Sequence, residues 1–128
     1  SFVNKIYTMA STAIFNNGDG SFRVEALPDI MQFSPINTVI SAEFDRDSIP
    51  EIFLAGNFSG TKPEEGRYDA NYGHILRFTD GKFNVDDFSS TGLDIKGVVR
   101  KAAIIRSVGN KKLLILAKNN DKLEFYEF

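Results

Sequence analysis

Four acidic side chains alternate along one short segment of the sequence, at Glu43, Asp45, Asp47 and Glu51. They take positions 1, 3, 5 and 9 of a nine-residue segment, and the backbone carbonyl of Ile49 takes position 7. Oxygen donors that alternate in a tight loop can converge on one point, and Ca²⁺ accepts six to eight oxygens in loose geometry. Four neighbouring carboxylates repel one another unless a cation or solvent relieves them. The spacing therefore predicts a calcium site, and the alternative is a solvated acidic hairpin that binds nothing.

Three residues of this segment depart from an ideal calcium loop. Ser48 stands at position 6, where glycine would ease a sharp turn. Glu43 stands at position 1, where the shorter aspartate is usual, and Arg46 adds a positive charge inside the loop. Both interpretations of the segment therefore stay open.

A second candidate site lies in the long segment 57–73, which contains Gly, Pro, Glu and Tyr and shows no periodicity. Unstructured connections of this length in compact domains are usually functional or mobile. Aromatic rings beside polar donors suit a sugar or a peptide. The candidate ligand-binding residues are Arg67, Tyr68, Asp69, Asn71 and Tyr72. The alternative is that Arg67 and Asp69 only hold the loop against the neighbouring strands.

No set of residues in the sequence predicts catalysis. His74 is the only histidine, and no Gly-x-Ser-x-Gly motif and no second imidazole accompany it. Asp86 and Asp87 are adjacent, so on a strand they point to opposite faces and are poorly placed as the acid pair of a glycosidase. We therefore expect that the chain is not an enzyme.

Short strands must position these candidates, because apolar or alternating runs recur between Gly, Asn and Asp clusters and helical spacing is nearly absent. The apolar run 51–56 is typical of a strand that is buried on both faces. Asp80-Gly81 predicts a hairpin turn. The expected strands are 3–9, 12–16, 21–27, 36–44, 51–56, 74–79, 82–87, 98–108, 111–118 and 122–128.

The sequence also repeats itself. Residues 19–22 (DGSF) match 80–83 (DGKF) at an offset of 61, and 53–57 (FLAGN) match 115–119 (ILAKN) at an offset of 62. One period holds about four strands, which is the composition of a propeller blade. We therefore predict an all-β fold of antiparallel four-stranded blades, a β-propeller fragment of about two blades. The alternative is a plain β-sandwich with accidental similarity.

The expected organisation is a single domain over 1–128. In it, 12–27 form half a blade, 36–87 a full blade and 98–128 a partial blade.

The 128 residues carry 15 Lys and Arg against 17 Asp and Glu, which gives no electrostatic reason to expect nucleic acid. There is no cysteine, and no apolar stretch approaches the ~20 residues of a membrane span, so we expect no membrane insertion. The first residues lack an initiator Met, which indicates a piece of a longer protein.

The repeat, the segment 49–57 (IPEIFLAGN) and the turn 16–22 (NNGDGSF) together resemble FG-GAP/VCBS repeats. The segments 66–73 (GRYDANYG) and 92–100 (GLDIKGVVR) resemble the C-terminal regions of large FG-GAP proteins of Bacteroidetes. The resemblance covers roughly 4–127. It implies an integrin-α-like β-propeller with a calcium loop between the first two strands of a blade. The calcium ligands that it implies are Glu43, Asp45, Asp47, the carbonyl of Ile49 and Glu51.

The same resemblance implies an exported protein that is extracellular, at the cell surface or periplasmic. Its expected role is adhesion, glycan handling or assembly, with a protein or glycan partner at the cell surface. The alternatives are an accessory domain of a cell-surface polysaccharide-processing enzyme and a structural spacer without a ligand. Because a fragment of two blades leaves open sheet edges, we also expect a homo-oligomer that pairs through those edges, or closure of the last blade by 12–27.

Overall fold

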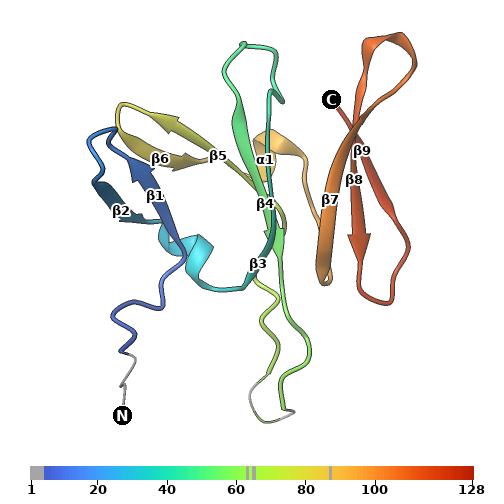
Figure 1. Ribbon diagram of the computed structural model, residues 1–128. Coiled ribbons are helices and arrows are strands. Elements are labelled where there is room, and N and C mark those ends of the chain that lie inside the picture. The colour runs from blue at the N-terminus through green and yellow to red at the C-terminus, as the bar shows by residue number, and fades with distance from the viewer. Residues whose placement is uncertain (1–4, 63, 65, 87) are drawn as a thin grey trace.

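The computed structural model describes residues 5–62, 64, 66–86 and 88–128, and these residues form short antiparallel strands joined by turns (Figure 1). The strands are β1 (Thr12–Asn16), β2 (Phe22–Ala26), β3 (Ile36–Ala42), β4 (Glu51–Gly56), β5 (His74–Thr79), β6 (Lys82–Val85), β7 (Val99–Arg106), β8 (Lys112–Lys118) and β9 (Glu124–Glu127). The helical turns are η1 (Asp29–Gln32), α1 (Phe88–Thr91) and η3 (Val108–Asn110). In this part of the chain, no helix has the length and apolar character needed to cross a membrane.

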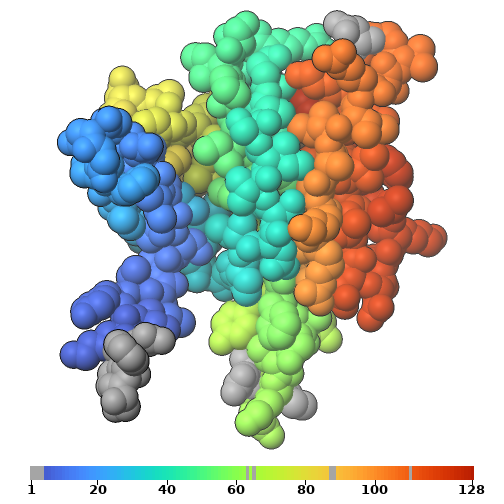
Figure 2. All heavy atoms as spheres, viewed as in Figure 1, coloured from blue at the N-terminus to red at the C-terminus, as the bar shows by residue number. Residues whose placement is uncertain are grey.

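The strands form three open antiparallel sheets. We call β1–β2 the hairpin, β3–β4–β5–β6 the central sheet and β7–β8–β9 the third sheet. The sheets stand side by side, with the hairpin and the third sheet on opposite sides of the central sheet (Figures 1 and 2). The predicted all-β fold with an antiparallel four-stranded unit is confirmed, and the sheets do not close on one another.

The sequence repeat corresponds to a repeat in strand pairing. A register shift lies between Ile36 and Thr38 at the start of β3, and an equivalent shift lies between Val99 and Lys101 at the start of β7. The N–H of Asn57 donates to the carbonyl of residue 35 at 3.0 Å, and the N–H of the residue 62 positions later, 119, donates to the carbonyl of 98 at 2.8 Å. Strands β7 and β8 therefore hold the same places in the third sheet as β3 and β4 hold in the central sheet.

The central sheet is covered on both faces. Side chains alternate along a strand, so Ile40, Phe53 and Ile75, which lie opposite one another on β3, β4 and β5, share one face. We call it the forward face; it packs on the third sheet. The opposite side is the rear face, where Leu54 and Leu76 join Met31 of η1 in a second core. The buried residues of the forward core are Phe53, Ala55, Ile75, Leu93, Ile95, Val99, Leu114 and Leu116.

Strand β4 is the centre of this arrangement. Phe53 and Ala55 are fully buried on the forward face, and Leu54 is 3% exposed on the rear face. Fully burying a Leu or Phe side chain is worth about 1.5–3 kcal/mol, so β4 anchors both cores. The expectation that 51–56 are buried on both faces is confirmed.

Two sequence expectations differ from the structure. No strand forms over residues 5–9, the described part of the expected strand 3–9, and the large apolar side chains there are exposed, as Tyr7 (90%) and Met9 (89%) show. A strand needs a neighbour for its backbone groups, and none of the described strands pairs with this segment. The long connection 57–73 contains one short antiparallel bridge, between Phe58 and Tyr68.

Asn57 fastens this long connection to the central sheet. Its side chain is buried, and its backbone has φ 82, a left-handed conformation that asparagine tolerates. Nδ2 donates to the carbonyls of Asn71 at 2.6 Å and Gly97 at 2.9 Å, and Oδ1 accepts the N–H of Asn71 at 2.9 Å. The amide thus joins the end of β4, the loop and the chain that enters β7.

We expect Asn57→Ala to lower the free energy of unfolding by about 2–3 kcal/mol, because it leaves buried backbone groups without partners. Urea denaturation measures the loss. Asn119→Ala is the matched control, since Asn119 holds the equivalent place but is exposed, and it should cost about 0.5 kcal/mol or less. Equal losses in the two variants would contradict the role assigned to Asn57.

Candidate metal centre

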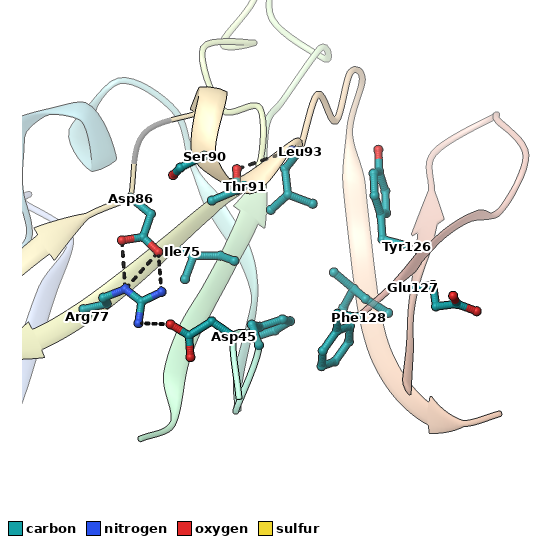
Figure 3. Close-up of a pocket in the computed structure, with 12 residues that line it drawn as sticks. Asp45, Ile75, Arg77, Asp86, Ser90, Thr91, Leu93, Tyr126, Glu127 and Phe128 are labelled. Carbon is teal, nitrogen blue, oxygen red and sulfur yellow. Dashed lines mark hydrogen bonds and ion pairs between the residues drawn. The ribbon is translucent and has the colours of Figure 1, made fainter. Parts of the chain in front are cut away.

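A cavity of about 260 Å³ lies between the central sheet and the third sheet (Figure 3). Ile75 and Leu93 form part of its apolar wall, and Phe128 lines it from beyond β9. The opposite end is polar, where Arg77 and Asp86 lie (Figure 3). The cavity therefore joins the forward core to a group of charged residues at the edge of the molecule.

The acidic loop between β3 and β4 adds Asp45 and Asp47 to this charged group. Arg46 and Ser48 both have left-handed backbones, with φ of 68 and 69. Between them, Asp47 donates its N–H to Asp45 Oδ1 at 3.1 Å, and Asp47 Oδ1 accepts the N–H of Ile49 at 2.7 Å. Aspartate side chains commonly bond the backbone two residues ahead in turns. These contacts fold the loop tightly and fix one oxygen of each aspartate.

Three of the predicted metal ligands come together in the structure. Asp45, Asp47 and Glu51 each offer a carboxylate oxygen, and these oxygens lie within 4.8 Å of one another. The two aspartates are exposed, whereas Glu51 is 1% exposed at the start of β4. Glu51 Oε2 also accepts the N–H of Phe44 at 2.8 Å. This acidic cluster could hold a metal ion.

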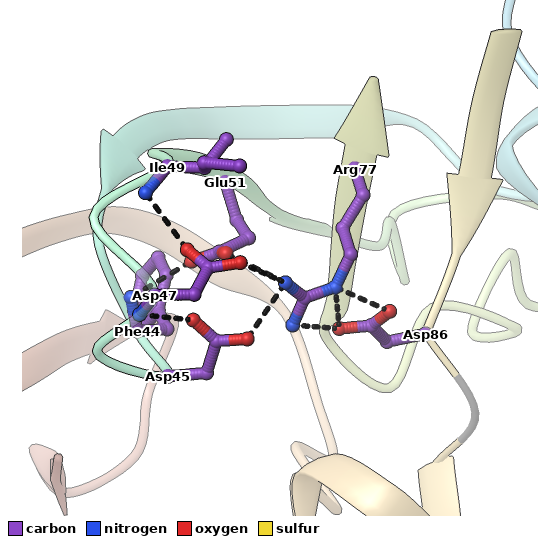
Figure 4. A network of polar contacts seen from close by, with 7 residues as sticks. All are labelled: Phe44, Asp45, Asp47, Ile49, Glu51, Arg77 and Asp86. Atoms are coloured by element: carbon purple, nitrogen blue, oxygen red, sulfur yellow. Dashed lines mark hydrogen bonds and ion pairs between the residues drawn. The ribbon is translucent and has the colours of Figure 1, made fainter. Parts of the chain in front are cut away.

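Arg77 on β5 reaches into the same cluster (Figure 4). Its Nη1 lies 2.7 Å from Asp45 Oδ2 and 2.8 Å from Glu51 Oε1. Asp47 Oδ2 lies 3.6 Å from the same nitrogen. On the other side, Nε lies 3.0 Å from each oxygen of Asp86, and Nη2 lies 2.9 Å from Asp86 Oδ2. One guanidinium therefore contacts four carboxylates.

Strand pairing explains why Arg77 meets the acidic loop. Arg77 lies two residues after Ile75, so its side chain is on the forward face. It also lies one position beyond the Ile52–Leu76 pair, opposite Glu51. The N–H of Asp86 donates to the carbonyl of Ile75 at 2.9 Å, which holds Asp86 beside the guanidinium at the end of β6. The spacing of residues along the sequence does not indicate Arg77, and it indicates Asp86 only as one of two adjacent acids; the register of β4 and β5 would have indicated Arg77.

The charges of the cluster do not balance. Four carboxylates and one guanidinium give a net charge of −3 when all are ionised. Hydrogen bonds to Asp86 outweigh desolvation and raise the pKa of Arg77 above its ordinary value. Desolvation alone would raise the pKa of Asp45, but the N–H of Asp47 and the guanidinium of Arg77 outweigh it, so the pKa of Asp45 lies below its ordinary value. The ionised forms therefore stabilise one another.

We expect Arg77→Gln to lower the free energy of unfolding at neutral pH by about 2–4 kcal/mol. Breaking a buried ion pair costs about 3–5 kcal/mol because it strands a charge, and Glu51 would be stranded here. The loss is smaller because the side chain of Arg77 is 29% exposed and solvent screens it. Chemical denaturation of the purified variant gives the value.

A double-mutant cycle with Glu51→Gln separates this ion pair from general damage. The double variant should recover part of the loss, since it no longer buries an unpaired carboxylate. The exposed Arg100→Gln serves as control for removing a positive charge. Additive losses in the double variant would contradict the coupling between Arg77 and Glu51.

Glu43 and Ile49 lie differently from the three clustered acids. Glu43 Oε2 is 3.7 Å from Nζ of Lys112 on β8, and the same Nζ donates to the carbonyl of Glu43 at 3.2 Å. Its Oε1 is buried and has no hydrogen-bond partner among the described residues. Glu43 thus contacts the third sheet and is not one of the grouped oxygens. Ile49 contributes an N–H to Asp47, and its side chain is 58% exposed.

The five candidate ligand-binding residues fall into two groups. Asn71 is 4% exposed, bonds Asn57 through its backbone, and accepts the N–H of Gly73 on its own Oδ1 at 3.0 Å. It is part of the structural fastening of the loop. The exposed members of the set are Arg67, Tyr68, Asp69 and Tyr72. Asp87, named above beside Asp86, lies outside the described residues.

No protein-family model, curated protein or solved structure matches this chain. The likeness to FG-GAP/VCBS repeats therefore rests on the sequence motifs alone.

His74 lines a second cavity, of about 310 Å³, together with Tyr72, Asp86 and Asp94. Its Nε2 is buried and lacks a hydrogen-bond partner in the described part of the chain. Burial disfavours the charged imidazolium and lowers the pKa of His74 below its ordinary value of 6.5. The side chain therefore remains neutral in the fold at a pH where it would already be protonated in the unfolded chain.

Stability should consequently fall as the pH drops below about 6.5, because the unfolded chain binds a proton there and the folded chain binds it only at a lower pH. His74 is the only histidine, so His74→Gln should flatten this dependence. Denaturant midpoints measured across the range test it. A variant with the same slope as the parent protein would show that other groups cause it.

Proposed function

We propose that this chain is a non-catalytic binding or scaffold module of an exported protein. In this proposal its acidic loop takes up Ca²⁺, and the stiffened sheet presents its loops to a protein or glycan outside the cell or at its surface. The observation that carries the proposal is the convergence of three carboxylate oxygens within 4.8 Å. The negative charge that Arg77 leaves uncompensated also favours the binding of a cation.

The donor set fits a hard, oxygen-binding cation. Asp45, Asp47 and Glu51 offer only carboxylate oxygens, which suit Ca²⁺ or Mg²⁺ better than transition metals. Two of the three lie on an exposed loop, and such a site suits the loose coordination of Ca²⁺ better than the strict octahedron of Mg²⁺. A divalent ion would reduce the net charge of the cluster from −3 to −1.

Arg77 has two sets of contacts, which lets it share the site with a cation. Nη1 contacts the three clustered acids, whereas Nε and Nη2 contact Asp86. If the ion takes the place of Nη1 among the acids, Arg77 can keep its bidentate contact to Asp86, which is the stronger kind of pair. Metal and guanidinium are then competitors for the same three oxygens.

Binding at this loop would steady the contact between two sheets. Phe44 lies beside Asp45, and its ring centroid is 6.4 Å from that of Phe53 and 4.6 Å from that of Phe128. Phe53 belongs to β4, and Phe128 follows β9. A cation that braces the loop would therefore brace the forward core as well. This supports a role in presenting a rigid sheet, and the exposed residues Arg67, Tyr68, Asp69 and Tyr72, in the loop at the other end of β4 (Figure 1), supply the contact surface.

Calcium should raise the melting temperature of the protein relative to a chelator-treated sample. A ligand that binds only the folded state stabilises it by about 2.7 kcal/mol at a hundredfold excess over Kd. Arg77→Gln should respond more strongly, because the competing cation is gone, and Asp47→Asn combined with Glu51→Gln should not respond. Scanning calorimetry with Ca²⁺, with Mg²⁺ and with chelator measures the shifts.

A melting temperature that calcium leaves unchanged, in both the parent protein and Arg77→Gln, would sink the calcium proposal. A response to calcium in the parent protein but a smaller one in Arg77→Gln would contradict competition with the guanidinium. The charge-neutral variant Asn84→Ala, at an exposed position of β6, controls for general effects of calcium on the fold.

A further inference from the structure

Among the residues that the structure describes, two apolar surfaces on opposite sides of the molecule have no cover. The first is on the third sheet, where Ala103, Ile115 and Phe125 lie opposite one another on β7, β8 and β9. Ile105 and Leu113 form the adjacent pair. Phe125 is 56% exposed and Ile105 is 46% exposed. An apolar sheet face of this kind marks an interaction surface.

The repeat identifies what covers such a face. Ile115 is equivalent to Phe53, 62 positions earlier, and the row Ala103–Ile115–Phe125 is equivalent to Ile40–Phe53–Ile75 of the central sheet. The open surface of the third sheet is therefore its forward face. In the central sheet the same face is buried, with Phe53 at 0%, and its cover is the rear face of the next sheet.

The second uncovered surface is the matching rear face of the hairpin. Ile14 pairs with Val24, and Phe22 lies on the same side of the hairpin. Phe22 is equivalent to Phe83, 61 positions later, which packs in the rear core of the central sheet. On the hairpin these side chains are 67%, 59% and 63% exposed for Ile14, Val24 and Phe22.

The opposite side of the hairpin is already used inside the molecule. Phe15 points the other way from Ile14, and its ring centroid lies 5.1 Å from that of Phe78 and 5.8 Å from that of Phe83. The hairpin thus lays its forward face on the rear face of the central sheet. A forward face therefore packs on a rear face twice: the hairpin on the central sheet, and the central sheet on the third sheet. The rear face of the hairpin and the forward face of the third sheet are left exposed.

We propose that a second copy of this chain docks by this contact, with the rear face of its hairpin on the forward face of the first copy's third sheet. The chain supplies both complementary halves, and its own two internal interfaces show that sheets of this type pack in that order. Phe22 and Val24 of one copy meet Ile115 and Phe125 of the other. The contact is head-to-tail, so it leads to a ring or an open chain of copies, not to a two-fold dimer. It requires no metal and is independent of the calcium loop.

Complementary variants test the proposal. Phe125→Arg removes the forward half, and Val24→Arg removes the rear half; both side chains are exposed, so the fold should survive, which circular dichroism and melting verify. Sedimentation velocity over a wide concentration range should show association of the parent protein and monomers for each variant alone. An equimolar mixture of the two variants should form a one-to-one complex, because each supplies the half that the other lacks.

Val108→Arg is the matched control, since Val108 is a 91% exposed apolar residue outside both surfaces, and it should associate like the parent protein. A parent protein that is monomeric at every concentration would overturn the proposal. So would association that only Phe125→Arg abolishes and that the mixture does not restore, because that result indicates two forward faces packed on each other.

Discussion

The burial of β4 on both faces is the constraint on which the rest of the structure depends. A strand of six residues with Phe53 and Ala55 on one side and Leu54 on the other must have a sheet or helix against each face. The third sheet covers one side, and Met31 of η1 with Leu27, which follows β2, covers the other. The same burial extends to the first residue of the strand, Glu51, and so places a carboxylate where water cannot solvate it.

That buried carboxylate explains the composition of the metal centre. A charge removed from water needs a partner close by, and β5 supplies Arg77 opposite Glu51. Because a guanidinium has five N–H donors in a fixed fork, one contact with Glu51 leaves others for Asp45 and Asp86. Asp45 and Asp47 of the acidic loop then lie close to Arg77, the cation that neutralises Glu51 of β4. The negative charge that remains after Arg77 is counted would attract a metal ion. Arg77 and a bound metal ion would therefore both reduce the repulsion among the same carboxylates.

The sequence could predict what depends on local pattern and could not predict what depends on register between distant strands. Alternation, the Asp-Gly turn and the repeat are sufficient to predict the strands from β1 to β9 and the burial of 51–56, because each is a short-range signal; the strand expected over 3–9 does not form over its described residues 5–9. Asp45, Asp47 and Glu51 were found by spacing. Spacing does not indicate Arg77, because Arg77 lies beside Glu51 only when β4 and β5 are paired. Likewise the direction of Glu43 is set by Lys112, which comes from another sheet.

The repeated packing order also implies an uneven distribution of stability. The central sheet buries two faces, whereas the hairpin and the third sheet each bury one, and an isolated two-stranded hairpin is marginal in water. The hairpin depends on Phe15 and its contacts with Phe78 and Phe83, so it is the part most easily opened. The third sheet has more to hold it, because the forward core is joined by the amide of Asn57 and by the hydrogen bond from the N–H of Ala102 to Thr38 Oγ1 at 3.1 Å. Because the sheets pack in one direction, the hairpin and the third sheet each keep one exposed apolar face. A further contact would therefore stabilise these two parts, whereas both faces of the central sheet are already covered.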